Sequence, residues 1–380
     1  MNELFFELLR VAIGTQEGLS RQPNADEWEE LYMMAKKQSV IGICFAGVQK
    51  TISRSALKGE DFSAIGMNEK LYLTWLGKTT RIQQRNKTIW DQCVALQKKF
   101  AADGFRSCIL KGAGVAALYR SEEPNPETDL SLLRQSGDID IWLDSTQDET
   151  LHYVMKICPT DDFDEKHIHF HCFKNTDVEV HWIPVKWENP ISNRIIKKYM
   201  GQVRNAQFAN ICGDLCLPTT TFQTVHQLMH VFRHYVYLGV GMRQLMDLYF
   251  AQRACIEGEN STTAVHEITA LFTQLRLMRF VAGTQWVLGK VMDLPKAQMI
   301  CEPDEREGRE LLEEMLQGGN FGQFSKEICV EEEPFVRRFF SRWSRKLRFF
   351  RYDPLGALVM PFTRLRLEIW MRWKRFAMKY

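Results

Sequence analysis

Apolar residues recur at helical spacing through the first hundred positions of the chain. Leu4, Phe5, Leu8 and Leu9 fall on one face of an opening helix, and a long amphipathic segment spans about 68–101. No group of side chains with catalytic or metal-binding potential stands out in this stretch of sequence. We interpret it as a helical N-terminal region that covers a sheet.

The spacing changes to alternation in the next part of the chain. The segments 105–110, 139–143, 167–173 and 178–183 each show the two-residue period of a β-strand, and the last two are predicted to form a hairpin. Helical spacing returns after Pro184. The predicted fold class is therefore α+β, with a small mixed β-sheet core embedded in a largely α-helical protein.

Four regions follow from this pattern. We expect a helical N-terminal region (1–100), a sheet core (101–185), a helical C-terminal domain (186–334) and a basic amphipathic tail (335–380). The proline at position 184 marks the change from sheet to helix.

Two aspartates interrupt the most regular strand pattern. In 136–144, Ile139 and Ile141 point to one face and Asp138 and Asp140 to the other. Aspartate is a poor strand former, so two of them on one strand face conflict with local propensity. Carboxylates so close repel each other unless a divalent cation such as Mg²⁺ or Mn²⁺ neutralises them. The alternative is an exposed edge strand whose acidic residues face solvent.

A candidate phosphate-binding turn precedes this strand. Lys111, Gly112, Ala113 and Gly114 connect the strand at 105–110 to a predicted helix. Such a turn offers backbone N–H groups, a helix N-terminus and a lysine to phosphate oxygens.

A third carboxylate lies on a later strand. Glu179 is flanked by Val178 and Val180, which repeats the pattern of an acidic residue between apolar neighbours. If this strand pairs beside the first, Glu179 comes to lie next to Asp138 and Asp140. Three carboxylates would then surround one cation site.

With these motifs, the sequence resembles the nucleotidyltransferase superfamily that has a polymerase-β-like catalytic core. It is similar to an uncharacterised bacterial family that carries Leu-Lys-Gly, Asp-Ile-Asp and Glu-Val-His motifs, here Leu110-Lys111-Gly112, Asp138-Ile139-Asp140 and Glu179-Val180-His181. The resemblance covers about 105–183 and extends more weakly over the helices that follow. It implies an NTP substrate and a cation held by the three carboxylates.

The turn and the following loop differ from the superfamily pattern. Ala113 stands where a second glycine or a serine is usual, and Asp138 follows Gly112 by 26 residues, which is a longer gap than usual. We interpret the excess as an inserted loop at 121–129, rich in turn formers and acids. It would be either a lid or a surface bulge.

Histidines are regularly spaced in two segments. One face of a predicted strand carries His167, His169 and His171, and one face of a predicted helix carries His226, His230 and His234. Both sets of histidines could bind a metal ion. However, the cysteines or the glutamate typical of zinc sites do not occur beside them in the sequence. For the strand set we favour a half-exposed polar face, and the role of the helix set stays open.

Arg243 follows a glycine-bounded turn, 239–241, and precedes Asp247 by about one helical turn. In the family that the chain resembles, such a turn followed by arginine and aspartate recurs. The resemblance therefore implies a role for Arg243 near the nucleotide or the acceptor. The alternative is a simple ion pair between Arg243 and Asp247 on the surface.

Composition bears on the cellular compartment of the protein. The 380 residues include ten cysteines, which are scattered, and no opening signal peptide or bilayer-length apolar run is visible. A reducing, cytoplasmic location is the expectation. The hydrophobic share of 45% and the charged share of 25% are ordinary for a globular protein, so neither changes this picture.

Charge is distributed unevenly along the chain. Residues 335–380 contain 13 basic and two acidic residues, which gives a formal charge of +11. Since the whole chain has a formal charge of +2, the rest of the chain carries −9. Within this tail an apolar stripe has helical spacing: Phe362, Leu365, Ile369, Trp373 and Phe376. Such a helix can lie on an anionic membrane surface, lie along nucleic acid, or pack its stripe on its own protein. We favour the last arrangement.

The leading functional hypothesis is metal-dependent nucleotidyl transfer. An NMP would move from an NTP to a hydroxyl-bearing acceptor, with pyrophosphate released and Mg²⁺ or Mn²⁺ held by Asp138, Asp140 and Glu179. One alternative is a nucleotide- or partner-binding module without turnover, which the alanine in the turn favours. Another is an RNA-modifying transferase, which relies on the basic tail.

Overall fold

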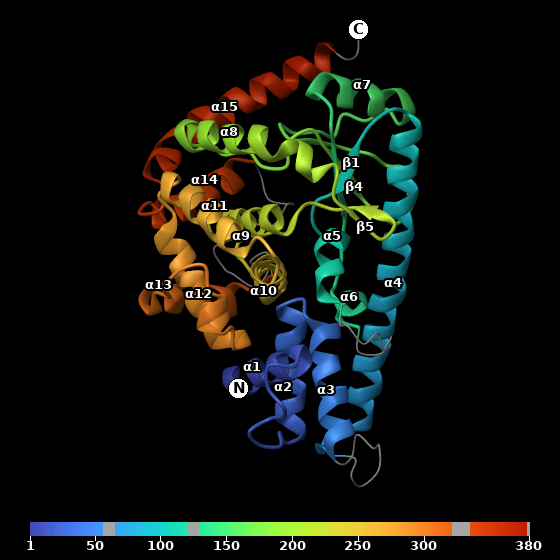
Figure 1. Ribbon diagram of the computed structural model, residues 1–380, viewed down its shortest axis with the longest axis vertical. Helices are drawn as coiled ribbons and strands as arrows, with labels where there is room; N and C mark the ends of the chain where they lie inside the picture. Colours follow the sequence, from blue (N-terminus) through green and yellow to red (C-terminus); the bar gives the residue numbers. More distant parts are fainter. Residues whose placement is uncertain (56–64, 121–128, 321–334, 378–380) are drawn as a thin grey trace.

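The computed structural model describes residues 1–55, 65–120, 129–320 and 335–377. The loop predicted at 121–129 lies outside this description except for Asp129. The described residues form a small mixed sheet surrounded by helices (Figure 1), which confirms the predicted α+β class.

Helices build the described N-terminal region. They are α1 (Asn2–Ile13), α2 (Ala25–Lys37), α3 (Ile41–Ser55) and α4 (Glu69–Ala102). The long helix predicted at about 68–101 is α4, and the side chain of Asn68 caps it by accepting a hydrogen bond from the Lys70 N–H. In Figure 1, α4 runs along one side of the molecule from α3 to the sheet, so it joins the N-terminal helices to the sheet.

The central sheet consists of β1 (Ser107–Ile109), β2 (Ile139–Leu143), β4 (Val178–His181) and β3 (His167–His169), in that spatial order. β2 and β4 are parallel, whereas β1 and β3 pair antiparallel at the edges. β2 is therefore central, and all of its residues are buried. The alternative of an exposed acidic edge strand is wrong, because β2 has a paired strand on each side.

The two faces of β2 contact different parts of the protein. Ile139, Ile141 and Leu143 join a core formed with α4 and with α7 (Gln147–Ile157). On the opposite face, Trp142 stacks on Phe222 with the ring centroids 5.8 Å apart. The alternation predicted for this strand is thus confirmed, and the face that carries Asp140 is turned towards the helical half of the chain.

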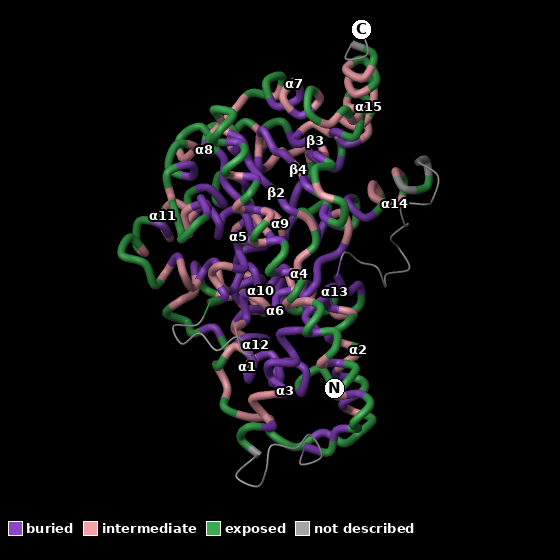
Figure 2. The backbone as a smooth tube through the Cα atoms, turned by 90° about the vertical axis from the view of Figure 1, so that its right-hand side faces the viewer, coloured by how far each residue is buried: buried purple, intermediate pink, exposed green. Residues whose placement is uncertain are grey.

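Helices also dominate the rest of the chain. They are α8 (Pro190–Gln207), α9 (Thr220–Tyr237), α10 (Met242–Ile256), α11 (Ser261–Gln274), α12 (Met278–Met292) and α13 (Glu305–Gly318), and a ribbon of β5 (Ile211–Cys212) and β6 (Leu215–Cys216) precedes α9. Figure 2 shows buried backbone running from the sheet through α9 and α10 to α1 and α3. The larger hydrophobic core is shared between the N-terminal helices and α9–α13. Since these regions share one core, the predicted division of the chain into four regions stays a prediction.

The basic tail forms α14 (Phe335–Arg348) and α15 (Pro354–Ala377). Its first half packs on the protein, because Arg345 and Lys346 are buried and their charged groups pair with Glu314 and Glu188. Basic residues of the tail thus pair with acidic residues of the rest of the chain.

The second half of the tail corrects our expectation. The apolar stripe on α15 does not pack on the protein: its side chains are exposed to solvent, from 60% for Ile369 and Trp373 to 74% for Phe362. The predicted apolar stripe is present on α15, but the rest of the protein packs against the opposite face of this helix. Among the described helices, none combines the length and the apolarity needed to cross a bilayer.

Candidate functional site

β2 and β4 bring two of the predicted carboxylates together. In the parallel register Asp140 lies opposite Glu179, and His181 follows two residues later on the same face. The His181 Nε2 atom lies 2.9 Å from Asp140 Oδ1 and 3.2 Å from Glu179 Oε2. A ring nitrogen that faces two carboxylates carries its proton there and donates it. The pairing of β2 with β4, on which the predicted role of Glu179 as a third carboxylate depends, is thus present.

Asp140 is fully buried yet ionised. Burial alone would raise its pKa, but the Lys111 ammonium, 2.7 Å from Oδ1, and the hydrogen bond from His181 outweigh burial and hold the pKa below its usual value. The same contacts raise the pKa of Lys111 and that of His181, although both groups are desolvated. The site is therefore a network of opposite charges that stabilise one another.

Glu179 belongs to the same network. Burial opposes its charge, but the hydrogen bond from His181 and the charge of Lys111 keep its pKa far below the usual range. A carboxylate with so low a pKa is a good cation ligand and a poor proton acceptor.

The predicted turn passes over the start of β2. Gly112 has φ +62°, a left-handed conformation that favours glycine, and a Cβ there would lie 3.2 Å from the Asp138 carbonyl oxygen. A Cβ on Gly114 would lie 2.5 Å from the Ile109 carbonyl oxygen. Close packing of the turn against β1 and β2 explains both glycines, and it places Lys111 beside Asp140.

The rest of the turn faces away from the carboxylates. The N–H of Gly114 donates to the Lys111 carbonyl, and Ala113 packs in the core on the far face of the sheet. The helix that follows, α5 (Ala113–Ala116), is a single turn. Of the four residues predicted to bind phosphate at the turn, Lys111 and Gly112 line the cavity described next.

A cavity of about 500 Å³ lies over this face of the sheet, between the turn, the start of β2, β4, α9 and α10. Its volume is in the range of small-molecule sites. Asp138, Glu179 and His181 line it, and Asp138 is half-buried. The basic residues of its lining are Lys111, Arg134, Lys166, Lys186, Arg233 and Arg243. Asp164 and Asp247 also line the cavity, so its six basic residues exceed its four acidic ones.

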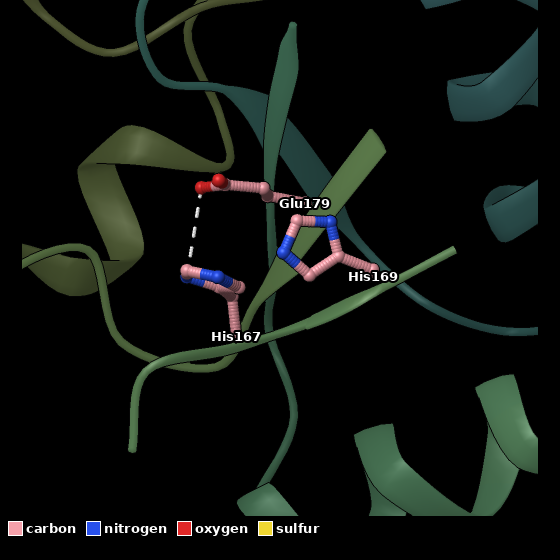
Figure 3. Close-up of side chains that lie close together, drawn as sticks. All are labelled: His167, His169 and Glu179. Carbon is pink, nitrogen blue, oxygen red and sulfur yellow. Dashed lines mark ion pairs between the residues drawn. The ribbon is translucent and has the colours of Figure 1, made fainter. Parts of the chain in front are cut away.

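Among the described residues, two groups of side chains could hold a cation. In Asp140, Glu179 and His181 the ligand atoms lie within 4.8 Å of one another, and so do those of His167, His169 and Glu179. In Figure 3 the Glu179 carboxylate points towards His167, and Nδ1 and Oε2 are 3.5 Å apart. Within the described residues Asp138 joins neither group, so its role as a ligand stays a prediction.

The strand histidines become more exposed along β3 and beyond. His167 is buried, His169 is half-buried and His171 is exposed, as expected for a half-exposed polar face. Burial and the neighbouring His181 lower the pKa of His167 to about 3. Its imidazole is therefore neutral at pH 7.

The helix histidines line the cavity from α9. His226, His230 and His234 form a column in which successive ring centroids are 6.3 and 4.3 Å apart. Burial, with a contribution from the Lys111 charge, lowers the pKa of His226 to about 3, and burial likewise lowers the pKa of His230 and that of His234. All three rings are thus held neutral beside a basic cavity.

Replacing His226 by glutamine is expected to flatten the dependence of stability on pH. The folded pKa lies below the unfolded value of about 6.5, so stability is fully present above pH 6.5 and falls as the unfolded state binds the proton. Between pH 7 and pH 5 this costs about 1–2 kcal/mol per histidine. Urea unfolding at both pH values measures the loss. An unchanged loss in His226→Gln would contradict a buried neutral ring.

Arg243 and Asp247 hold the segment that leads into β2. Arg243 Nη1 donates to the Gln135 carbonyl at 3.0 Å, and Arg134 binds the Asp247 carboxylate through Nε at 2.6 Å and Nη2 at 2.7 Å. The Tyr119 hydroxyl also donates to Asp247, at 2.7 Å. Asp247 and Arg134 are buried, so a surface ion pair does not describe this part of α10. Arg243 lines the cavity, as its predicted role requires.

Several residues of the cavity carry no sequence signal. Lys166, Asp164 and Arg233 come from the loop before β3 and from α9, and no motif marks them. His181 could have been found, because it lies two positions after Glu179 on an alternating strand and therefore on the same face.

Comparison with known proteins agrees with this geometry. The family described as uncharacterised nucleotidyltransferase matches residues 24–293, which include the sheet, α9 and α10. No curated protein and no solved structure matches the chain. The family match spans more than half of the sequence, and it supports nucleotidyl transfer as the general activity. The chain thus belongs to the uncharacterised nucleotidyltransferase family.

Proposed function

We propose that this protein transfers an NMP from an NTP to a hydroxyl-bearing acceptor and releases pyrophosphate, with Mg²⁺ or Mn²⁺ as cofactor. The observation that carries the proposal is the pair Asp140 and Glu179, side by side on parallel strands, with Asp140 buried and Glu179 at the wall of the cavity. In such an arrangement the carboxylates would bind the cation, and the basic side chains would bind the triphosphate that the cation contacts.

The donor set fits a divalent cation. Asp140 Oδ2 is buried and has no hydrogen-bond partner among the described residues, so it can accept a metal ion. Asp140 and Glu179 would be the ligands, with Asp138 beside them, and His181, which donates its Nε2 proton to both carboxylates, would hold them in place. When bound, the cation would neutralise phosphate charge and stabilise the attacking and leaving oxygens.

The basic lining would bind the triphosphate. Burial and the neighbouring charge of Arg233 lower the pKa of Lys166 to about 8, which means that cationic charge is under-compensated there. A phosphate chain would relieve that repulsion. Lys111 and Arg243 would contribute as predicted, and phosphate oxygens would compete with Asp140 for the Lys111 ammonium.

The acceptor would enter from the helical side of the cavity. α9 and α10 supply most of that wall, including the neutral histidine column. The low pKa of Glu179 favours a role as cation ligand over a role as base for the acceptor hydroxyl.

The decisive experiment supplies purified protein with Mg²⁺ or Mn²⁺, each labelled NTP and a cell extract. We expect pyrophosphate release that requires the cation, together with label on one class of acceptor. Asp140→Asn protein is the control for contaminating transferases. Absence of label and of pyrophosphate with every NTP and both cations would contradict the proposal.

A second function is favoured by the ion pair between Lys111 and Asp140. A lysine that neutralises the carboxylate could keep the site as a nucleotide-binding module without turnover. Isothermal titration separates the two functions. NTP binding without pyrophosphate release would favour the module, and binding followed by release would favour the transferase.

A further inference from the structure

The outer face of α15 presents a row of large apolar side chains. Phe362, Leu365, Ile369 and Trp373 are 74%, 62%, 60% and 60% exposed. Their spacing of three, four and four residues places them on one stripe along the helix. A helix that only covers its own protein turns such a stripe inward, and here the stripe is turned outward.

The opposite face of α15 is attached to the protein. Arg364 pairs with Glu188 at 3.0 Å, and Lys374 pairs with Asp148 at 2.6 Å. Trp370 packs edge-on against Phe163 with the ring centroids 6.0 Å apart. These contacts fix the rotation of the helix, so the exposure of the stripe is a property of the folded protein.

Arginines flank the stripe on both sides. Arg366 and Arg372 are exposed, and at 100° per residue they lie about 40° to one side of Phe362 and about 80° to the other. Glu368 is turned inward, where it lines a cavity beside Arg364. The exposed charges on the described part of α15 are therefore positive.

We propose that α15 docks this protein on the surface of an anionic lipid bilayer. The apolar stripe enters the boundary between headgroups and acyl chains, and Arg366 and Arg372 meet the lipid phosphates. The chemistry of this face suits a bilayer better than a second copy of the chain. Two α15 helices packed stripe to stripe would bring like charges together.

The docked helix would also lie close to the functional cavity. The inner face of α15 lines a cavity of about 300 Å³, which shares Lys166, Lys186 and Arg233 with the larger cavity. One helix diameter, about 10 Å, would separate that space from the bilayer. The docking proposal does not depend on the transferase proposal, because no catalytic residue takes part in it.

The test is co-sedimentation of the full chain with vesicles of phosphatidylcholine alone or of an equal mixture with phosphatidylglycerol. The double variant Leu365→Gln/Ile369→Gln changes the stripe. The matched control, Leu73→Gln/Ile211→Gln, changes two apolar residues on α4 and β5 that are 54% and 67% exposed. Since all four residues are exposed, we expect each variant to fold, which circular dichroism verifies.

We expect binding to the mixed vesicles that the stripe variant reduces about tenfold or more and the matched control leaves unchanged. Raising the salt concentration should weaken the binding of the wild-type protein to the mixed vesicles. Equal binding to neutral vesicles, equal loss in both variants, or no binding would each overturn the proposal. Concentration-dependent dimers that only the stripe variant abolishes, without vesicle binding, would assign the face to a second copy instead.

Discussion

Replacing Asp140 by asparagine is expected to reduce nucleotidyl transfer by a factor of about a hundred to a thousand or more. The carboxylate lies opposite Glu179, and its Oδ2 atom is the buried acceptor available to a cation. Asparagine keeps the size of the side chain but removes the negative charge. The rate of pyrophosphate release with the preferred NTP measures the effect.

Asp144→Asn is the matched control for this variant. Asp144 follows the same strand, but its carboxylate pairs with Arg106 and Arg204. Both variants remove one ion-paired carboxylate at β2, so both should lower stability, and only Asp140→Asn should abolish transfer. Full activity in Asp140→Asn, or equal loss in both variants at a temperature where both are folded, would contradict the cation site.

The stability effect at Asp140 differs from what the sequence alone suggests. From the sequence, removing one of two adjacent carboxylates should relieve repulsion and raise stability without metal. In the structure, Asp140 is paired with Lys111 and His181, so its loss leaves buried positive charge uncompensated. Thermal unfolding of Asp140→Asn without added metal should therefore show a lower Tm than wild type.

Replacing Asp247 by asparagine is expected to lower the free energy of unfolding by about 3–5 kcal/mol. Asp247 is 3% exposed and holds Arg134 through two hydrogen bonds as well as the Tyr119 hydroxyl. Without the carboxylate, the buried charge of Arg134 loses the ion pair that holds it. Urea unfolding followed by circular dichroism measures the change.

Glu257→Gln, at the C-cap of the same helix, is the control for this prediction. Glu257 pairs with Arg253 one helical turn away, and its side chain is 49% exposed. Exposed pairs of this kind contribute about 0.2–1 kcal/mol. Similar losses in Asp247→Asn and Glu257→Gln would show that burial does not set the strength of the Arg134 pair.

Asp247→Asn should also affect the site. Arg134 and Gln135, which α10 holds, lead directly into the segment of Asp138 and Asp140. Loosening this attachment changes the position of the carboxylates, and small displacements at a catalytic centre reduce rates. We therefore expect Asp247 to act on the site by positioning, which a lower rate of pyrophosphate release in folded Asp247→Asn protein would show.

Much of the local structure was predictable. The alternation in 139–143 and 178–181, the long helix α4 and the glycine at the turn all depend on neighbours a few residues away. The carboxylates that stand on strands against local propensity marked the strand face on which Asp140 and Glu179 contact His181, and the chemistry at this face stays a prediction. Tail helices with an apolar stripe were also recognisable from spacing alone.

Other features depended on segments far apart in the sequence. Local pattern could show that Arg243 and Asp247 share a helix, but not that Arg134 would bind Asp247 in the interior. The histidine column on α9 was visible as a period, whereas its position along the wall of the cavity was not. In α15 the period was predicted correctly and the buried face wrongly, because contacts to Glu188 and Asp148 set the rotation.

The sequence by itself determined which residues share a face of a strand or helix, because that depends on a period of two or 3.6 residues. Only the tertiary structure decided that β2 and β4 run parallel with Asp140 opposite Glu179, that Lys111 reaches Asp140, and that the apolar stripe of α15 faces outward. Each of these depends on which distant segment covers a given face, and that is settled by packing and charge pairing across the whole chain.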